Sequence, residues 1–325
     1  MKIAHLVTSN TFAGIEQHVF ELVKAMQNEI SQVILCEPFL QDHMHGVKTE
    51  KMKMGSRYSF INIIKLKQYI KKNNIDLLHC HGAKASTIGN WVKLTSNIKL
   101  VSTIHGYKSN NSSFKQSDAV IGVNKELIKN IPSGTFIPNW YNPNHRGECS
   151  LRTGPIIAVG RLEKVKGFDN LIKSWVNIQE KLQIIGSGPE QNRLQALITL
   201  LNLSNRIEII TNCSYAKIEE KYKIASGLVI SSLREGGPRV LLEAINHEIP
   251  VIGTKVGILP QLISKELLAE PNNQLSLQSL LEEMVPLLPQ LNVSALKVVI
   301  SKDFSIENAS KKTKETYLSL LSDCS

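Results

Sequence analysis

The sequence lacks the features that mark a membrane-spanning or disulfide-stabilised protein. None of its apolar runs is long enough to cross a bilayer as a helix. Residues 1–8 hold one lysine and a short alternating run, which is typical of a first strand rather than of a signal peptide. The five cysteines are odd in number and no two are spaced as Cys-x-x-Cys, which argues against a disulfide framework. We therefore expect a cytoplasmic protein with reduced thiols.

The chain is also poor in aromatic residues, at 6% of its 325 residues. It has no helix-turn-helix, zinc-finger or aromatic–basic motif, so we expect no nucleic-acid partner. Its net charge of +10 is nevertheless uneven, with 18 Lys and Arg against 10 Asp and Glu up to residue 150, and 20 against 18 beyond it. A basic half indicates an anionic partner.

One predicted helix, residues 57–74, shows how this charge could be used. Its apolar positions predict packing on a sheet, while Lys65, Lys67, Lys71 and Lys72 point to solvent. Lysines in such a position attract an anionic membrane by about 1 kcal/mol each. We expect the basic N-terminal half to contact an anionic membrane surface, as a peripheral protein on the inner face of the cytoplasmic membrane.

Strands and helices alternate along the whole chain, and the strands are almost continuously apolar. This pattern predicts parallel sheets covered on both faces, and the strands are too many for one sheet. We predict an α/β fold with two Rossmann-like, doubly wound domains, residues 1–150 and 151–304, joined through the polar stretch 142–154, and an amphipathic helix in 305–325 that packs back on the first domain. The predicted strands are 2–7, 32–35, 75–80, 99–104, 156–160, 182–185, 206–210, 228–231 and 250–253. The predicted helices include 16–26, 61–72, 169–176, 190–201, 216–223 and 305–320.

Two glutamates, Glu235 and Glu243, lie eight residues apart around a Gly-Gly-Pro turn. Pro238 suits the first turn of a helix, and Gly236 and Gly237 allow a ligand to approach the backbone. A helix start is a natural phosphate site, and a carboxylate can accept hydrogen bonds from adjacent sugar hydroxyls. Two glutamates at this spacing also arise by chance, so the pair alone is weak evidence.

Two cations, Arg161 and Lys166, follow the predicted strand 156–160. Cations at a strand end can neutralise a pyrophosphate and support its departure as a leaving group. Taken by itself, this segment is explained equally well by an ordinary solvated loop.

An ordered set of segments resembles a known family. REGGPRVLLEAINHEIPVIGT, residues 234–254, looks like the E-x7-E signature of retaining glycosyltransferases with the GT-B fold, in which two Rossmann-like domains face each other across a cleft. KIAHLVTSNTFAGIEQHV, DLLHCHGAKAS, VSTIHG, GRLEKVKG and IIGSGPEQNRL are similar to further segments of glycosyltransferase family 4, in the same order. The resemblance covers nearly the whole chain.

The resemblance implies a role for each charged position. Arg161 and Lys166 would bind the donor diphosphate, Glu243 the ribose hydroxyls, and Glu235 the donor sugar. His105 would face the transferred sugar and would complete a catalytic set with Arg161, Lys166 and Glu235. The remaining implied donor contacts are Gly14, Asn212, Gly236, Gly237, Pro238 and Arg239, and the implied acceptor contacts are Gly14, Glu16 and His105.

The same resemblance implies the reaction. It would be metal-independent, hexosyl-type transfer with retention, from a nucleotide-diphosphate sugar to an acceptor hydroxyl, without a cofactor. We expect a UDP-sugar as donor and a lipid-linked, lipopolysaccharide, capsule or other cell-surface glycan as acceptor. The sequence has no Asp-x-Asp that would hold a divalent ion. The alternatives are a nucleotide-sugar epimerase of the same fold and a non-catalytic glycan- or membrane-binding protein.

Several positions depart from the family pattern. Ala13 stands where a first glycine is usual, Ser231 replaces a proline and Gln261 a glutamate. Glu248 replaces a glycine after the helix, so we expect Asn246 or His247 to adopt the left-handed turn.

Two other patterns admit a structural interpretation. In His79-Cys80-His81, neighbouring strand residues point to opposite faces, so the three cannot converge on one metal ion. We interpret them as a strand end entering a loop and predict no metal site. His105 would, without the resemblance, be a hydrogen-bonded structural histidine at a strand end.

Overall fold

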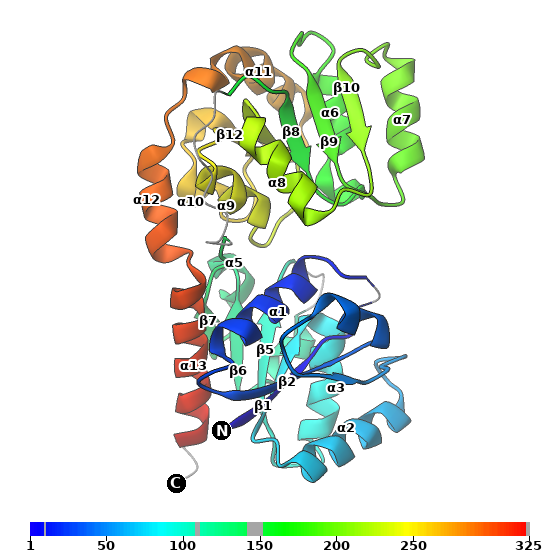
Figure 1. Ribbon diagram of the computed structural model, residues 1–325, viewed down its shortest axis with the longest axis vertical. Helices are drawn as coiled ribbons and strands as arrows, with labels where there is room; N and C mark the ends of the chain where they lie inside the picture. Colours follow the sequence, from blue (N-terminus) through cyan, green and yellow to red (C-terminus); the bar gives the residue numbers. More distant parts are fainter. Residues whose placement is uncertain (10, 108–110, 142–151, 323–325) are drawn as a thin grey trace. The chain divides into compact units, whose positions relative to one another are not determined.

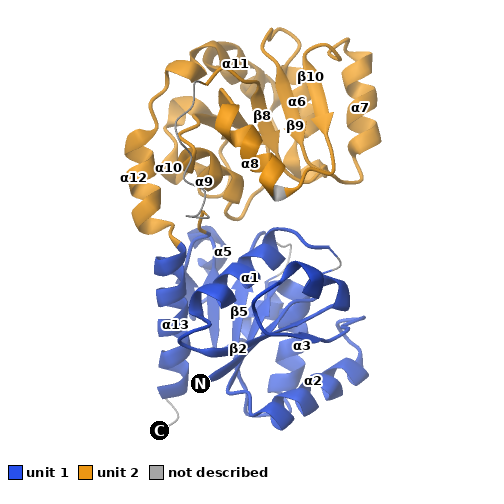
Figure 2. Cartoon of the chain, viewed as in Figure 1, with its two compact units in different colours: residues 1–139, 306–325 blue, residues 140–305 orange. Residues whose placement is uncertain are grey.

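The computed structural model describes residues 1–9, 11–107, 111–141 and 152–322 (Figure 1). The chain forms two compact units (Figure 2). Unit 1 comprises Met1–Asn139 with Ile306–Ser325, and unit 2 comprises Trp140–Ser305. The predicted domain boundary at residue 150 and most of the polar stretch 142–154 lie outside the described residues.

Unit 1 is built on a parallel sheet with the strand order β3-β2-β1-β4-β5-β6-β7. The order reverses between β1 and β4, which makes the carboxyl ends of these two strands a topological switch point. The strands are β1 Lys2–Leu6, β2 Ser31–Cys36, β3 Thr49–Lys51, β4 Leu77–His81, β5 Lys99–Ile104, β6 Ala119–Gly122 and β7 Gly134–Phe136. The helices are α1 Gly14–Met26, α2 Phe60–Asn73, α3 Gly82–Lys93, α4 Ser112–Lys115, α5 Lys125–Ile128 and α13 Ile306–Ser322, with the 3-10 helix η1 Pro38–His43.

Strand alternation divides the side chains of this sheet between two layers. Ala4 and Leu6 pack on one face with apolar residues of α2 and α3. His5 points to the opposite face, where Tyr317 of α13 contacts it. Helix α13 packs beside α1 in this unit, and Lys314 of α13 forms an ion pair with Glu29.

Unit 2 contains a second parallel sheet, of order β10-β9-β8-β11-β12-β13, with its switch point between β8 and β11. Apolar helices pack on both faces, one cluster around Trp175 and the other around Leu242. The strands are β8 Ile156–Val159, β9 Leu182–Ile185, β10 Ile207–Ile210, β11 Gly227–Ile230, β12 Val251–Thr254 and β13 Leu268–Ala269. The helices are α6 Phe168–Ser174, α7 Gln191–Leu200, α8 Tyr215–Ile224, α9 Arg239–Asn246, α10 Leu259–Leu262, α11 Gln274–Met284 and α12 Ser294–Asp303, with η2 Lys164–Lys166, η3 Lys265–Leu267 and η4 Val285–Gln290.

The predicted α/β architecture of two doubly wound domains is confirmed. All the predicted strands occur, within two residues of their predicted bounds, whereas β3, β6, β7 and β13 were not predicted. Among the described residues no single helix is long and apolar enough to span a membrane, and one sharply bent pair of consecutive helices meets the requirement by length and composition.

Two local predictions are wrong. Strand β4 continues through His81 and α3 begins at Gly82, so His79-Cys80-His81 does not enter a loop. The left-handed residue after α9 is Glu248 itself, with φ 57°, and not Asn246 or His247. The Glu248 carboxylate lies 2.8 Å from Lys297 Nζ and forms an ion pair with it.

Candidate functional site

The predicted donor residues of unit 2 gather at the carboxyl edge of its sheet. Arg161 follows β8, Asn212 follows β10, and Glu235 follows β11. Because all six strands are parallel, these loops share one edge, which is where open α/β sheets bind ligands.

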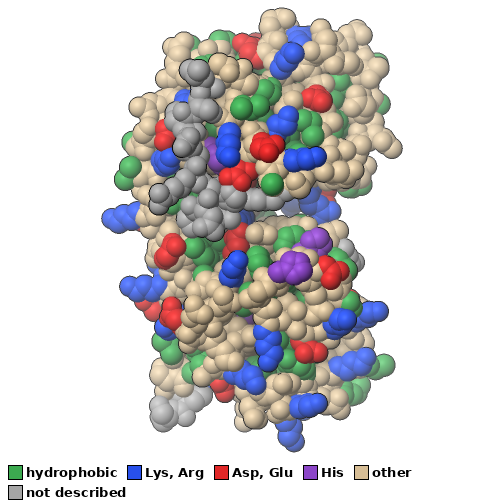
Figure 3. All heavy atoms as spheres, viewed as in Figure 1, with side chains coloured by type: hydrophobic (Ala, Val, Ile, Leu, Met, Phe, Trp, Pro, Cys, Tyr) green, Lys and Arg blue, Asp and Glu red, His purple; other side chains and the backbone are tan. Residues whose placement is uncertain are grey.

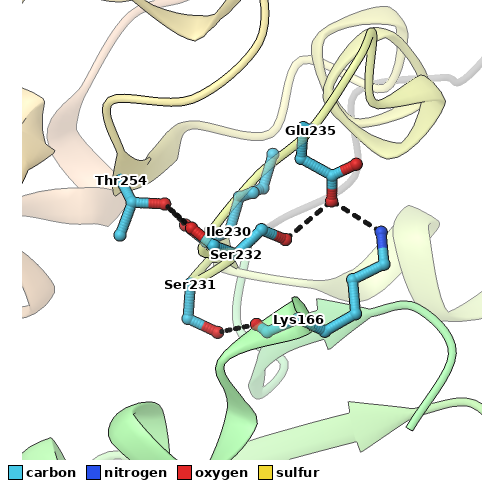
Figure 4. Close-up of polar contacts among 6 residues, drawn as sticks. All are labelled: Lys166, Ile230, Ser231, Ser232, Glu235 and Thr254. Atoms are coloured by element: carbon cyan, nitrogen blue, oxygen red, sulfur yellow. Dashed lines mark hydrogen bonds and ion pairs between the residues drawn. The ribbon is translucent and has the colours of Figure 1, made fainter. Parts of the chain in front are cut away.

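A charged cluster forms the centre of this edge (Figure 4). Lys166 Nζ and Ser232 Oγ each lie 2.6 Å from the same oxygen, Glu235 Oε1. The side chains of Lys166 and Glu235 are 22% and 13% exposed, so the pair is only partly hydrated. The second oxygen, Glu235 Oε2, forms no hydrogen bond within the described part of the chain, which leaves it able to accept one from a ligand hydroxyl.

Backbone contacts fix the position of Lys166. Ser231 Oγ donates a hydrogen bond of 2.9 Å to the Lys166 carbonyl, and Leu233 N–H donates to Val165 O at 2.8 Å. Gly167 follows with φ 64°, and a Cβ there would lie 2.2 Å from the Ser231 carbonyl oxygen. Only glycine therefore fits at this contact. Ser231, which departs from the family pattern, thus joins the β11 loop to the lysine turn.

The second glutamate lies on α9. Pro238 is the N-cap residue of this helix, one position before its first turn, and Glu243 lies one turn further along. Tyr222 of α8 donates a hydrogen bond of 3.0 Å to Glu243 Oε2. Sequence reasoning missed both Tyr222 and Ser232, because a hydroxyl partner on another loop or helix leaves no pattern of spacing.

Arg161 and Asn212 lie at more exposed positions of this edge. The Arg161 side chain is 53% exposed, and its guanidinium pairs with Glu163 at 2.8 Å. Asn212 adopts φ 54°, and its N–H lies 3.3 Å from Ser187 Oγ. Gly186, at φ 155°, allows the backbone after β9 to approach Gly160, where a Cβ would lie 1.9 Å from the carbonyl oxygen.

At the carboxyl edge of unit 1, histidines take the place of ion pairs. His5 Nε2 lies 3.0 Å from Gln32 Oε1, and His5 Nδ1 lies 3.1 Å from His81 Nε2. Because the amide oxygen accepts, His5 carries its proton on Nε2 and accepts from His81 at Nδ1. His81 therefore carries its proton on Nε2, and its Nδ1 is a bare acceptor with no partner among the described residues.

Burial keeps these imidazoles neutral. It lowers the pKa of His5 to about 4 and that of His105 to about 3. Burial also lowers the pKa of His79 and of His81 well below the ordinary value, and neighbouring imidazoles lower both further. His79 is held between Tyr317 Oη at 2.6 Å and Thr103 Oγ1 at 2.7 Å.

Some of these histidines also have the geometry to hold a metal ion. Ring nitrogens of His18, His81 and His105 lie within 4.8 Å of one another, as do those of His5, His79 and His81. Both nitrogens of His5 and of His79 already form hydrogen bonds, which favours a hydrogen-bonded network for the second trio. Cys80 packs on the opposite face of β4, in the apolar cluster of α2 and α3.

The remaining predicted residues of unit 1 lie where α1 begins. Gly14 is the first residue of α1, and a Cβ there would meet nothing within 4 Å. Ala13 is extended, with φ −145°, so its replacement of a glycine requires no positive φ. The buried Glu16 accepts a hydrogen bond of 2.8 Å from Ala13 N–H at Oε2, while its Oε1 has no partner in the described ranges. Glu16 thus caps α1.

Known proteins match both halves of the chain. The model for "Glycosyltransferase Family 4" matches residues 12–131, and that for "Glycosyl transferases group 1" matches residues 152–286. An uncharacterized glycosyltransferase of Methanocaldococcus jannaschii is 28% identical over 301 residues, which are 84% of each chain.

Solved structures show the same fold. The chain superposes on Anabaena HepE in complex with UDP-glucose with a TM-score of 0.85, 18% identity, and coverage of 98% of this chain and 100% of that one. It superposes on the apo form of the lipopolysaccharide outer core galactosyltransferase WaaB with a TM-score of 0.77, 19% identity, and coverage of 98% and 99%. The two family models, the curated relative and the fold together identify the chain as a glycosyltransferase of the GT-B type.

Proposed function

We propose that this glycosyltransferase transfers a hexose from a UDP-sugar to an acceptor hydroxyl with retention of the anomeric configuration. The observation that carries the proposal is the convergence of Lys166 and Ser232 on Glu235 Oε1, which leaves Oε2 for a ligand. A cation beside a hydroxyl-binding carboxylate is the pairing that a sugar diphosphate needs, because its phosphates are anionic and its sugar offers hydroxyl donors.

In this proposal each unit 2 residue acts on one part of the donor. Lys166 and Arg161 neutralise the diphosphate, and the N-terminus of α9 adds its N–H groups. Glu235 accepts a hydrogen bond from the donor sugar, and Glu243, held by Tyr222, accepts from the ribose. The backbone of Gly236 to Arg239 and the loop at Asn212 complete the donor contacts.

Unit 1 would bind the acceptor. Its neutral imidazoles offer two ring nitrogens without a partner among the described residues, His81 Nδ1 and His105 Nε2, and an acceptor hydroxyl can form a hydrogen bond with either. His105 would face the transferred sugar, with Gly14 and Glu16 beside the acceptor. The donor phosphate would take the hydroxyl proton as the new bond forms on the face that the leaving group vacates.

The proposed reaction uses no metal ion, because Lys166 and Arg161 supply the positive charge that the leaving diphosphate requires. HepE, which shares the fold, was solved with UDP-glucose, and this favours UDP as the carrier. The name of WaaB favours an acceptor in lipopolysaccharide or another cell-surface glycan. We place the reaction at the inner face of the cytoplasmic membrane, where a lipid-linked acceptor is presented.

A thermal-shift panel with UDP, GDP, ADP and their sugar conjugates tests the donor assignment. UDP at a hundred times its dissociation constant should stabilise the wild type by about 2.7 kcal/mol. Glu243→Ala should abolish this shift, while the exposed Glu220→Ala on α8 should retain it. The absence of a shift with every nucleotide would refute the proposal. A new nucleotide-sugar formed without acceptor would instead indicate an epimerase.

A further inference from the structure

A lysine-lined pocket lies in unit 1, between the edge strand β3 and helix α2. Its volume is about 560 Å³. Strand β3 ends the sheet, and α2 covers the sheet face next to it. We call this site the lysine pocket; its walls include Pro38, Lys51, Lys53, Lys65, Tyr69 and Lys72.

The charge of the lysine pocket is strongly positive. Its four lysines are all exposed, and none forms a side-chain hydrogen bond or ion pair with another described residue. Of the nearby acids, Glu50 adds to the effect of burial in raising the pKa of Tyr69, and Glu37 accepts a hydrogen bond from the N–H of Met54 at 2.9 Å. Four cations against one exposed carboxylate leave a surplus that attracts phosphate-bearing ligands.

Exposed apolar side chains adjoin the lysine pocket. Tyr58, Phe60 and Ile61 are 70%, 71% and 64% exposed and lie within four consecutive positions of the chain, so they form a group of exposed apolar side chains. Ile61, Lys65, Gln68 and Lys72 are spaced by four, three and four residues and therefore share one face of α2. Ile61 thus continues the face that lines the pocket, with Phe60 and Tyr58 just before it in the chain, and Figure 3 shows Lys and Arg side chains over this part of unit 1.

We propose that the lysine pocket binds the phosphate headgroups of anionic membrane lipids while Tyr58, Phe60 and Ile61 enter the outer part of the bilayer. Apolar side chains beside lysines are the combination that holds a helix at a membrane interface. This surface would hold the protein at the membrane where the proposed lipid-linked acceptor lies. The purpose of membrane binding therefore rests on the proposed function, but membrane binding itself does not depend on catalysis.

Vesicle co-sedimentation tests the inference. Wild-type protein should bind vesicles of phosphatidylcholine with phosphatidylglycerol and not vesicles of phosphatidylcholine alone. Replacing Lys51, Lys53, Lys65 and Lys72 by Gln should weaken binding about 100-fold or more. Replacing four exposed unit 2 lysines, Lys181, Lys217, Lys265 and Lys302, by Gln removes the same charge and should change binding less than about 3-fold.

Two further experiments test the contribution of the apolar residues and distinguish lipid phosphate from free phosphate. Replacing Phe60 and Ile61 by Ser should weaken binding to anionic vesicles about 10-fold or more. Inorganic phosphate should compete only at high millimolar concentration. Binding of soluble phosphate without binding of vesicles, equal loss in both lysine variants, or binding to neutral vesicles alone would each overturn the inference.

The UDP thermal shift, measured on the same variants, keeps this inference distinct from the proposed function. The lysine-pocket variant should retain the full shift. Vesicle binding that fails while the shift persists refutes the lysine pocket alone. A missing shift with intact vesicle binding refutes the donor assignment and leaves the lysine pocket standing.

Discussion

The two units present the same edge of a parallel sheet with opposite chemistry. In unit 2 the edge holds the partly exposed ion pair of Lys166 and Glu235. In unit 1 it holds His5, His79 and His81, which are at most 3% exposed, and which burial keeps uncharged. A shared fold therefore does not determine the chemistry of its binding edge, and the side chains at the strand ends do.

The difference matches the two proposed ligands. A sugar diphosphate is charged and needs cations and carboxylates, which unit 2 provides. An acceptor hydroxyl is neutral and can form a hydrogen bond with an uncharged imidazole, which the unpartnered nitrogens of His81 and His105 offer among the described residues. Substitutions that remove charge from the unit 2 edge, or conditions that add charge to the unit 1 edge, should abolish this difference between the two units.

The largest effect is expected from the unit 2 cation. Lys166→Gln should lower turnover about 100-fold or more, because the leaving diphosphate then loses a preorganised positive charge. Lys164→Gln is the matched control, since Lys164 is an exposed lysine of the same turn. Steady-state kinetics with a UDP-sugar measure both. An equal loss in the two variants, or no loss in either, would contradict the assigned role.

Acid should destabilise unit 1 before unit 2. The pKa is about 4 for His5 and about 3 for His105 in the folded chain, against about 6.5 unfolded. Between these values the unfolded state binds more protons, so stability falls as the pH falls through this window. Each such histidine should lower the free energy of unfolding by roughly 2 kcal/mol between pH 6.5 and pH 5.

Urea unfolding at pH 7 and at pH 5 measures the stability of each unit. Every sample is then labelled by a short pulse of hydrogen exchange at one fixed pH, so that the labelling conditions are the same. Peptides from β4 in unit 1 should lose protection at lower urea when the pH is 5, and peptides from β9 in unit 2 should change less. An equal loss in both units would show that the buried histidines are not the cause.

Alanine substitutions at two glycines distinguish a structural role from a proposed role in ligand binding. Gly167→Ala should destabilise unit 2 by about 1–3 kcal/mol, because it combines positive φ with a contact of 2.2 Å to Ser231. Gly14→Ala should leave stability unchanged or slightly raised but lower turnover about 10-fold, since a new Cβ meets only the ligand. Thermal unfolding and kinetics check both, and full turnover in Gly14→Ala would remove Gly14 from the site.

A chelator should have no effect on turnover. In the proposed reaction Lys166 and Arg161 carry the charge that a metal ion would otherwise supply, so EDTA at millimolar concentration should leave the rate unchanged. A loss that Zn²⁺ restores would instead point to the histidine trio His18, His81 and His105, whose ring nitrogens lie within 4.8 Å of one another.

The sequence predicted best what depends on local pattern. The apolar strands β5 and β9 were placed residue for residue, because a buried parallel strand is a continuous apolar run. The site was predicted as separate positions: nothing in the spacing of Lys166 and Ser232 indicates that both contact the same oxygen of Glu235. Tyr222 was missed for the same reason, since its contact with Glu243 depends on how α8 packs beside α9.

The left-handed turn at Glu248 shows a third kind of limit. Sequence rules favour Asn over Glu at positive φ, yet Glu248 adopts this conformation, with its carboxylate paired to Lys297, 49 residues away. Tertiary contacts of this kind leave no local signal.

Hydrogen exchange with and without saturating UDP tests the central claim most directly. The proposed site predicts protection confined to unit 2, in peptides covering residues 160–167, 186–188 and 235–243, with unit 1 peptides such as 77–81 unchanged. The same protection should be missing in Glu243→Ala. Protection centred on the histidine edge of unit 1, or none in unit 2, would contradict the assignment of the charged edge to the nucleotide-sugar.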